Sequence, residues 1–269
     1  MTAPRFYGSD SLNVATYDQR TVPAADGPLA ADIAFYIDLG RHVGGPVLDL
    51  GCGTGRVAWP LARAGFEVVG LDRSPHMLAR AESKRADVPE EVSGRVQFVE
   101  GDMSSFALDR RFGLSVIPFR SFQILLEPEE QRACLDSIRD HLRPGGILAL
   151  QLFDPLLETL VPGEGQAPSP DRGTVTQPGT GNDVTVHVVR RRNDPLHQVF
   201  VEEWEFTERG PDGAVLRREH ETLAMRWTYR HEMRYLLELC GFEIVGEYSD
   251  FQGARPAYGR EQVWVARRP

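Results

Sequence analysis

Apolar residues in the first 154 positions form short continuous runs, separated by longer stretches with helical spacing. The runs predict buried strands, because a strand covered on both faces is apolar at nearly every position. The stretches between them repeat apolar residues every three or four positions, which predicts amphipathic helices. We therefore expect right-handed strand–helix–strand units and a parallel sheet. The predicted strands are 47–50, 67–71, 95–99, 112–117 and 147–153.

Local signals mark the ends of these helices. Ser74 followed by Pro75 is a typical start, since serine caps the first amides and proline has no N–H to satisfy. Gly65 is expected to end the helix after the first strand. Arg143-Pro144-Gly145-Gly146 is expected to end the helix before the fifth strand. The predicted helix starts are Pro28, Thr54, Pro75 and Pro128.

The pattern changes after Asp154. Residues 155–183 are rich in proline and glycine and are expected to form a loop. A glycine-containing turn at 210–213 indicates a hairpin in the segment that follows. The predicted antiparallel strands of this segment are 184–189, 198–207 and 215–227.

The last segment returns to the earlier rhythm. Thr228 is expected to cap a helix that ends at Gly241, before two closing strands at 242–248 and 262–266. The chain therefore divides into four parts along the sequence. They are an N-terminal arm or lid (1–27), an α/β core (28–154), a loop with an antiparallel β insertion that caps the substrate (155–227), and the C-terminal part of the core (228–269).

Composition narrows the class of protein. The chain has 269 residues and a formal net charge of −9, which disfavours a nucleic-acid substrate. No apolar stretch approaches the length of a membrane span, and residues 1–10 lack the apolar segment of a secretory leader. The three cysteines show no C-x-x-C spacing, which favours buried free thiols in a reducing compartment. We expect a cytoplasmic protein that binds neither membrane nor nucleic acid.

Three alternating glycines follow the first strand, at Gly51, Gly53 and Gly55. Each allows a positive φ or a close approach of the backbone to a ligand. In the dinucleotide pattern G-x-G-x-x-G the third glycine would fall on Arg56. The spacing therefore favours a nucleoside ligand without a pyrophosphate, although a nicotinamide dinucleotide stays an alternative.

Two carboxylates follow the next strands. Asp72 ends the second strand, where an ionised carboxylate would accept hydrogen bonds from both hydroxyls of a ribose. Asp102 ends the third strand and would accept from an exocyclic amine such as adenine N6. A glycine loop with these two acids describes a site for an adenosine.

With these motifs, the chain from about Pro28 onward resembles a class I S-adenosylmethionine (SAM)-dependent methyltransferase of the small-molecule branch (methyltransferase domain 25-like). Residues 49–55 match its E/D-x-G-x-G-x-G motif; Asp72, Gly101-Asp102-Met103 and Pro144-Gly145-Gly146 match its later motifs in order. The resemblance implies an α/β, Rossmann-like sheet of seven strands with helices on both faces. Its strand order would be 3-2-1-4-5-7-6, with the last strand antiparallel.

The resemblance also implies roles for cofactor-binding residues. Gly51 and Gly53 would pack against the amino-acid part of SAM, and Asp72 would hold the ribose. Arg56 would either reach the SAM carboxylate or lie on a helix surface. Cys52 suits the loop because it is small, which is a simpler account than a nucleophile. The full implied set is Asp49, Gly51, Cys52, Gly53, Gly55, Arg56, Asp72, Arg73, Met77, Asp102, Met103, Ile117 and Pro118.

Acceptor and catalytic residues are less constrained. Arg120 either pairs with an acidic acceptor or braces its loop. Tyr17 resembles the lid tyrosine of small-molecule N-methyltransferases, with simple packing as the alternative. His231 is a candidate base because its unperturbed pKa lies at about 6.5, with a helix-start histidine of no catalytic role as the alternative. The predicted acceptor-contacting residues are Phe119, Arg120, Phe122 and Tyr229.

The activated sulfonium methyl of SAM needs mainly a lone pair aimed at it, which explains why no catalytic triad or metal motif is visible. The predicted function is therefore in-line methyl transfer to a nitrogen or oxygen of a small metabolite, without a metal. A nicotinamide-dependent oxidoreductase, an aminopropyl transferase and a non-catalytic SAM-binding protein are the alternatives. Either a monomer or a homodimer is compatible with the sequence.

Overall fold

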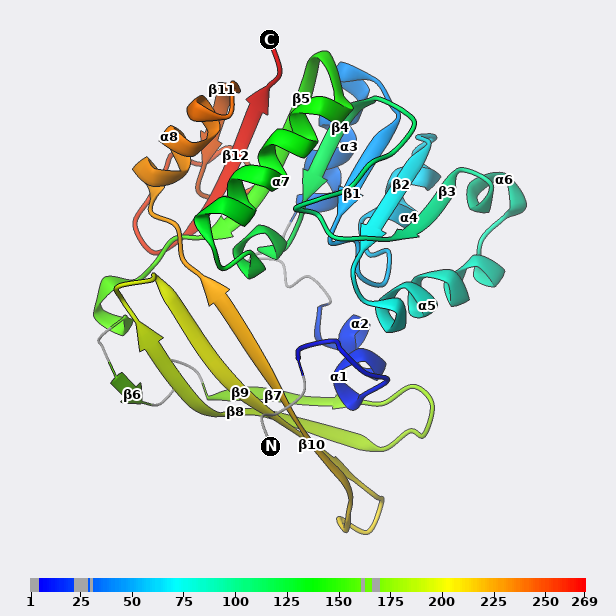
Figure 1. Ribbon diagram of the computed structural model, residues 1–269. Helices are drawn as coiled ribbons and strands as arrows, with labels where there is room; N and C mark the ends of the chain where they lie inside the picture. Colours follow the sequence, from blue (N-terminus) through cyan, green and yellow to red (C-terminus); the bar gives the residue numbers. More distant parts are fainter. Residues whose placement is uncertain (1–4, 22–28, 30, 161–162, 166–169) are drawn as a thin grey trace. The chain divides into compact units, whose positions relative to one another are not determined.

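A computed structural model describes residues 5–21, 29, 31–160, 163–165 and 170–269 (Figure 1). The chain forms two compact units. We call Pro23–Pro155 with Trp227–Pro269 the core unit, and Met1–Val22 with Leu156–Arg226 the insertion unit. The expected helix start at Pro28 lies outside the described residues.

The core unit is built on a seven-stranded sheet with the order β11-β12-β5-β4-β1-β2-β3. Strand β12 is antiparallel to both of its neighbours, and the other pairs are parallel. This confirms the predicted order and the antiparallel last strand. The strands are β1 (Val47–Leu50), β2 (Val68–Asp72), β3 (Val96–Glu100), β4 (Phe112–Ile117), β5 (Leu142–Phe153), β11 (Glu243–Tyr248) and β12 (Glu261–Arg267).

Helices cover both faces of this sheet, as predicted (Figure 1). Helices α7 and α8 bury apolar side chains on one face, and α3 and α4 on the other. Within the described residues, no helix is long and apolar enough to cross a membrane. The helical segments are α3 (Asp32–Val43), α4 (Ala58–Arg63), α5 (Pro75–Ser83), η1 (Lys84–Asp87), α6 (Glu90–Ser93), η2 (Ser121–Ile124), α7 (Pro128–His141) and α8 (Arg230–Leu239).

Helix boundaries follow the predicted signals in part. Ser74 accepts a hydrogen bond from the Met77 amide at 3.2 Å and caps α5, as predicted. Helix α4 begins at Ala58 and not at Thr54, because the preceding residues form turns. The predicted Thr228 cap was wrong, since Tyr229 is the N-cap residue of α8.

Strand β5 also begins earlier than predicted. Residues 143–146 belong to the strand and do not merely end the preceding helix. The reason is pairing with the C-terminus: the Gly145 amide donates to the Arg268 carbonyl and the Arg268 amide to the Gly146 carbonyl, both at 2.8 Å. The last residues of the chain thus extend the sheet at its opposite end from the glycine loop.

The insertion unit is a second, antiparallel sheet with the order β10-β9-β8-β6, and β7 also pairs with β8. The three predicted strands are present; the first extends further than expected, and the other two match their predicted bounds to within two residues. The loop predicted for 155–183 was wrong in part, since it contains β6 and β7. The unit's elements are α1 (Leu12–Ala15), α2 (Tyr17–Arg20), η3 (Leu157–Thr159), β6 (Gly163–Gly165), β7 (Asp171–Thr176), β8 (Asp183–Asp194), β9 (Val199–Arg209) and β10 (Val215–Arg226).

The N-terminal segment is fastened to this second sheet by carboxylates of β10. Glu219 accepts from the Leu12 amide at 2.6 Å. Glu221 accepts from the Tyr7 amide at 3.0 Å and from Asn13 Nδ2 at 2.6 Å. Residues 5–21, the described part of the predicted N-terminal arm, therefore belong to the insertion unit, and these hydrogen bonds join them to its sheet.

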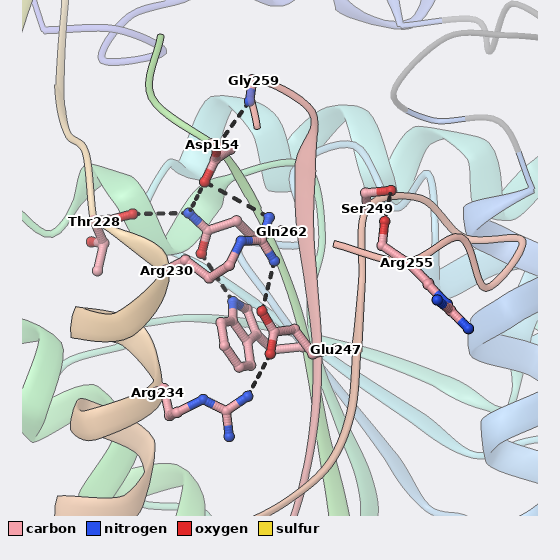
Figure 2. A network of polar contacts seen from close by, with 10 residues as sticks. Asp154, Thr228, Arg230, Arg234, Glu247, Ser249, Arg255, Gly259 and Gln262 are labelled. Carbon is pink, nitrogen blue, oxygen red and sulfur yellow. Dashed lines mark hydrogen bonds and ion pairs between the residues drawn. The ribbon is translucent and has the colours of Figure 1, made fainter. Parts of the chain in front are cut away.

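A polar network secures the core unit where the chain leaves it and returns (Figure 2). Gln262 of β12 donates from Nε2 to Asp154 Oδ1 at 2.9 Å and to the Thr228 carbonyl at 3.0 Å. Trp264 donates to Gln262 Oε1 at 3.1 Å. Glu247 of β11 binds Arg230 and Arg234 at 2.8 and 2.5 Å. The buried Gln262 therefore joins the sheet to Asp154, near the point where the chain leaves the core unit, and to Thr228, near the point where it returns.

Candidate active site

The expected ligand-binding edge lies at the carboxyl ends of β1 and β4. These strands are adjacent, but the chain continues from β1 to β2 on one side and reaches β4 only after β3. This is the point where strand order reverses, and open α/β sheets bind ligands in the crevice there. The glycine loop follows β1, and a tight turn follows β4.

The glycine loop is held against β2. The amides of Gly51 and Cys52 donate to the Leu71 carbonyl at 2.8 and 3.1 Å. Gly51, Gly53 and Gly55 have φ values of 68°, 56° and 75°, which residues with a Cβ rarely adopt. A Cβ on Gly51 would also lie 2.7 Å from the side chain of Ser121. The alternating glycines are therefore required by the backbone itself.

Asp72 lies at the end of β2 and supports this loop. Its Oδ2 accepts from the Gly53 amide and its Oδ1 from the Ser74 amide, both at 2.8 Å. Burial raises the pKa of Asp72, and the Ser74 and Gly53 amides oppose that rise. The residue stays partly exposed, and each carboxylate oxygen can accept a further hydrogen bond. This geometry fits a carboxylate that also holds a ribose.

A buried group of charges lies behind the loop. Arg56 forms an ion pair with Asp32 of α3 at 2.7 Å, and the Arg56 side chain is only 12% exposed. The helix-surface interpretation of Arg56 was therefore wrong. Asp49 is fully buried, and burial raises its pKa to about 7, opposed by Arg56 and assisted by Asp72. Sequence reasoning missed Asp32 because its partner lies far along the chain.

The remaining predicted cofactor residues differ in exposure. Asp102 is exposed and accepts from the Ser104 amide and hydroxyl at 2.8 and 2.7 Å. Met103 is buried, with its Cε 3.3 Å from the position of a Cβ on Gly51. Arg73 is exposed, and Met77, a residue of α5, is buried. Asp102 is therefore an exposed acid just beyond the end of β3, and its contact with an adenine stays a prediction.

Cys52 is buried within the glycine loop. Burial raises the pKa of its thiol well above the usual value, and Asp49 and Asp72 add to the rise. The thiol therefore stays protonated and acts as a small packing group. Among the described residues, no three His, Cys, Asp or Glu side chains are grouped so that they could hold a metal ion.

The residues predicted to contact the cofactor or the acceptor near the turn after β4 differ in their burial and contacts. Ile117 and Pro118 are buried at the strand end. Arg120 forms an ion pair with Glu261 of β12, which supports the bracing interpretation. Phe122 is fully buried in the core between the sheet and α7, so its packing accounts for it without an acceptor. Phe119 is partly exposed, and its contact with an acceptor stays a prediction.

Three predicted residues lie elsewhere. Tyr229 and His231 are exposed at the start of α8 in the core unit. Tyr17 starts α2 in the insertion unit, where it is mostly buried and its ring meets the edge of Tyr7 at 5.6 Å. Packing therefore accounts for at least part of the role of Tyr17. Sequence reasoning also missed Gln151 and Glu261, which contact the turn after β4.

Comparison with known proteins agrees with this geometry. Residues 47–146 match the model of the family described as "Methyltransferase domain". The chain is 30% identical to the cypemycin N-terminal methyltransferase of Streptomyces sp over 94% of this chain and 98% of that protein. Two solved structures are also similar over nearly their whole length.

The first is the CcbJ methyltransferase from Streptomyces caelestis, with a TM-score of 0.77, 28% identity, and 98% of each chain covered. The second is SAM-bound CalS10, an amino pentose methyltransferase from Micromonospora echinaspora involved in calicheamicin biosynthesis. Its TM-score is 0.67 at 25% identity, covering 96% of this chain and 97% of that one. These matches support the methyltransferase interpretation over the nicotinamide-dependent alternative. The glycine loop, the acid at the end of β2 and the full-length relatives together show that the chain belongs to the family of SAM-dependent methyltransferases.

Proposed function

We propose that this enzyme transfers the methyl group of SAM to an amine nitrogen of a small molecule, with a hydroxyl oxygen as the second candidate acceptor. The main support for SAM binding is the glycine loop, which lies where the strand order reverses. This loop is hydrogen-bonded to the partly exposed Asp72. Nitrogen is favoured because two relatives are named for methylation at an N-terminus and of an amino pentose. The acceptor is proposed to be a small molecule on the same grounds.

SAM supplies an activated methyl group, and the residues of the chain supply orientation. We propose that Asp72 holds the ribose, Asp102 the adenine amine, and Gly51 and Gly53 the amino-acid part. Arg56 is already paired with Asp32, so it would reach the SAM carboxylate only as part of that buried pair. Ile117 and Pro118 would lie beneath the methionine portion, and Arg73 and Met77 beside the adenine.

An amine that is protonated at neutral pH must lose a proton before it attacks. We propose His231 or Tyr17 as the group that receives this proton, and Phe119 and Tyr229 as acceptor contacts. His231 is exposed, so it would pass the proton that it receives from the amine on to solvent. We also propose that the insertion, residues 155–227, acts as the substrate cap and selects the acceptor. Three buried free cysteines support a cytoplasmic, reducing location.

A panel of paired amines and matching alcohols tests the proposal, with release of S-adenosylhomocysteine (SAH) as the signal. We expect turnover with an amine and none with its alcohol, and loss of turnover in Asp72→Ala. Turnover by alcohols alone would move the proposal to oxygen. SAM binding without turnover on any compound would favour the non-catalytic alternative. Unchanged turnover in His231→Ala would leave Tyr17 as the proposed base.

A further inference from the structure

The turn after β4 contains two consecutive residues in the left-handed region, and neither is glycine. Phe119 has φ 48° and Arg120 has φ 66°. A side chain with a Cβ is disfavoured there, so such a pair persists only where surrounding contacts hold it. The turn lies at the carboxyl edge beside the glycine loop, where the ligand crevice is expected.

Two residues from neighbouring strands hold this turn. Gln151 of β5, fully buried, accepts from the Phe119 amide at 3.0 Å and donates to Glu261 Oε2 at 3.0 Å. Glu261 of β12 also accepts from Arg120 Nε at 3.3 Å and pairs with its guanidinium. Both left-handed residues are therefore fixed by the same glutamine–glutamate pair.

Further contacts join the turn to the glycine loop. The Arg56 guanidinium lies 6.0 Å from the centre of the Phe119 ring. Ser121, the next residue of the turn, packs where a Cβ on Gly51 would lie. A shift of the turn would therefore move the groups that face the loop after β1.

We infer that Gln151 and Glu261 are positioning residues that set the crevice wall at the amino-acid end of SAM. The acids for adenosine, Asp72 and Asp102, lie on the β2 and β3 side of β1, whereas this turn lies on the β4 side. The turn therefore faces the opposite end of the cofactor from the adenine. This step rests on the cofactor orientation proposed above.

Calorimetric titration of the whole protein with two ligands distinguishes binding of the amino-acid end of the cofactor from binding of its adenosine end. SAH carries the amino-acid end, and 5′-methylthioadenosine lacks it. We expect Gln151→Leu and Glu261→Ala to weaken SAH binding at least 10-fold and methylthioadenosine binding less than 3-fold. Glu261→Gln keeps an oxygen acceptor and should restore SAH binding to within 3-fold of the wild type.

Matched controls are Gln131→Leu, a buried glutamine on α7, and Glu243→Ala, whose ion pair with Arg267 lies at the other end of β12. Both should leave the ratio of the two affinities unchanged. Equal weakening of both ligands by Gln151→Leu and Glu261→Ala, or no weakening, would overturn the positioning role. If Asp72→Ala weakens neither ligand, the proposed orientation fails instead. Should Gln151→Leu not fold, the Glu261 pair of variants decides the question.

Discussion

The two sheets bury charge in different ways. Among the described residues of the core unit, the buried charged side chains are Asp32 and Asp49, which surround Arg56 behind the glycine loop. The insertion unit buries a larger set, spread over its strands: Arg191, Glu202, Glu208, Glu221 and Arg226. The core unit thus concentrates buried charge at its ligand edge, whereas the insertion unit uses it as internal structure.

The Arg191–Glu202 pair shows how the insertion unit does this. Their side chains are 9% and 3% exposed and meet at 3.0 Å across β8 and β9. Trp204 donates to the second oxygen of Glu202 at 3.0 Å, and the Arg191 guanidinium lies 4.0 Å from the centre of the Phe200 ring. Burial lowers the pKa of Arg191, and Glu202 opposes that effect. This difference predicts which substitutions cost stability and which cost cofactor affinity.

The largest expected effect is on stability, from Glu202→Ala. Removing one partner leaves Arg191 buried without its charge partner, which costs about 3–5 kcal/mol. Urea denaturation should show the loss, while SAH affinity of the folded protein stays unchanged. Glu203→Ala is the matched control on the other face of β9, where the Arg190 contact is exposed and 3.9 Å long. Its cost should be under about 1 kcal/mol. A cost for Glu202→Ala as small as that of Glu203→Ala would contradict the comparison.

Asp72→Ala should have the next largest effect, on affinity. Losing charge-assisted hydrogen bonds to the ribose should weaken SAH binding about 100-fold, or about 3 kcal/mol. Calorimetry measures this, with circular dichroism to show that the protein stays folded. Asp109→Ala, an exposed aspartate in the loop before β4, is the control. An unchanged SAH affinity in Asp72→Ala would place the ribose elsewhere.

Asp49→Asn should change the pH dependence of stability. The pKa of Asp49 is about 7 in the folded protein, against about 3.9 when unfolded, so the folded state holds its proton more tightly. Its contribution to stability is complete below pH 4 and is lost as pH rises through 7. The loss is at most about 1.4 kcal/mol per pH unit for one proton. Urea midpoints of wild type and variant should therefore diverge in favour of the variant from pH 5 to pH 8. Parallel curves would show that Asp49 is ionised throughout.

The smallest effect is expected from Arg267→Ala. Its ion pair with Glu243 is about half exposed, at 45% and 53%, so its loss should cost less than about 1 kcal/mol. Urea denaturation and SAH titration should both be near wild type. A large loss of stability would mean that exposed pairs in the core unit matter as much as buried pairs in the insertion unit.

Much of the core unit was predictable, because its apolar runs and helix caps are local signals. The strand order followed from the resemblance and is confirmed. Strands β6 and β7 were missed because their sequence is rich in glycine and polar residues, and only pairing with β8 makes them strands. Gln151 and Glu261 carry no local signal, since their roles depend on a turn contributed by another strand. Asp32 was missed because its partner, Arg56, lies 24 residues further along the chain.

Strand β12 has a consequence for synthesis on the ribosome. It is the last strand of the chain, yet it lies between β5 and β11 (Figure 1). Its Gln262 also forms hydrogen bonds with Asp154 and Thr228, which lie near the two points where the chain passes between the core unit and the insertion unit. The seven-stranded sheet of the core unit therefore cannot be completed until the β12 residues, Glu261–Arg267, have left the exit tunnel. In a nascent chain stalled before Glu261, the edge of β5 that pairs with β12 would be exposed. Chaperones bind and proteases attack exposed edges of this kind.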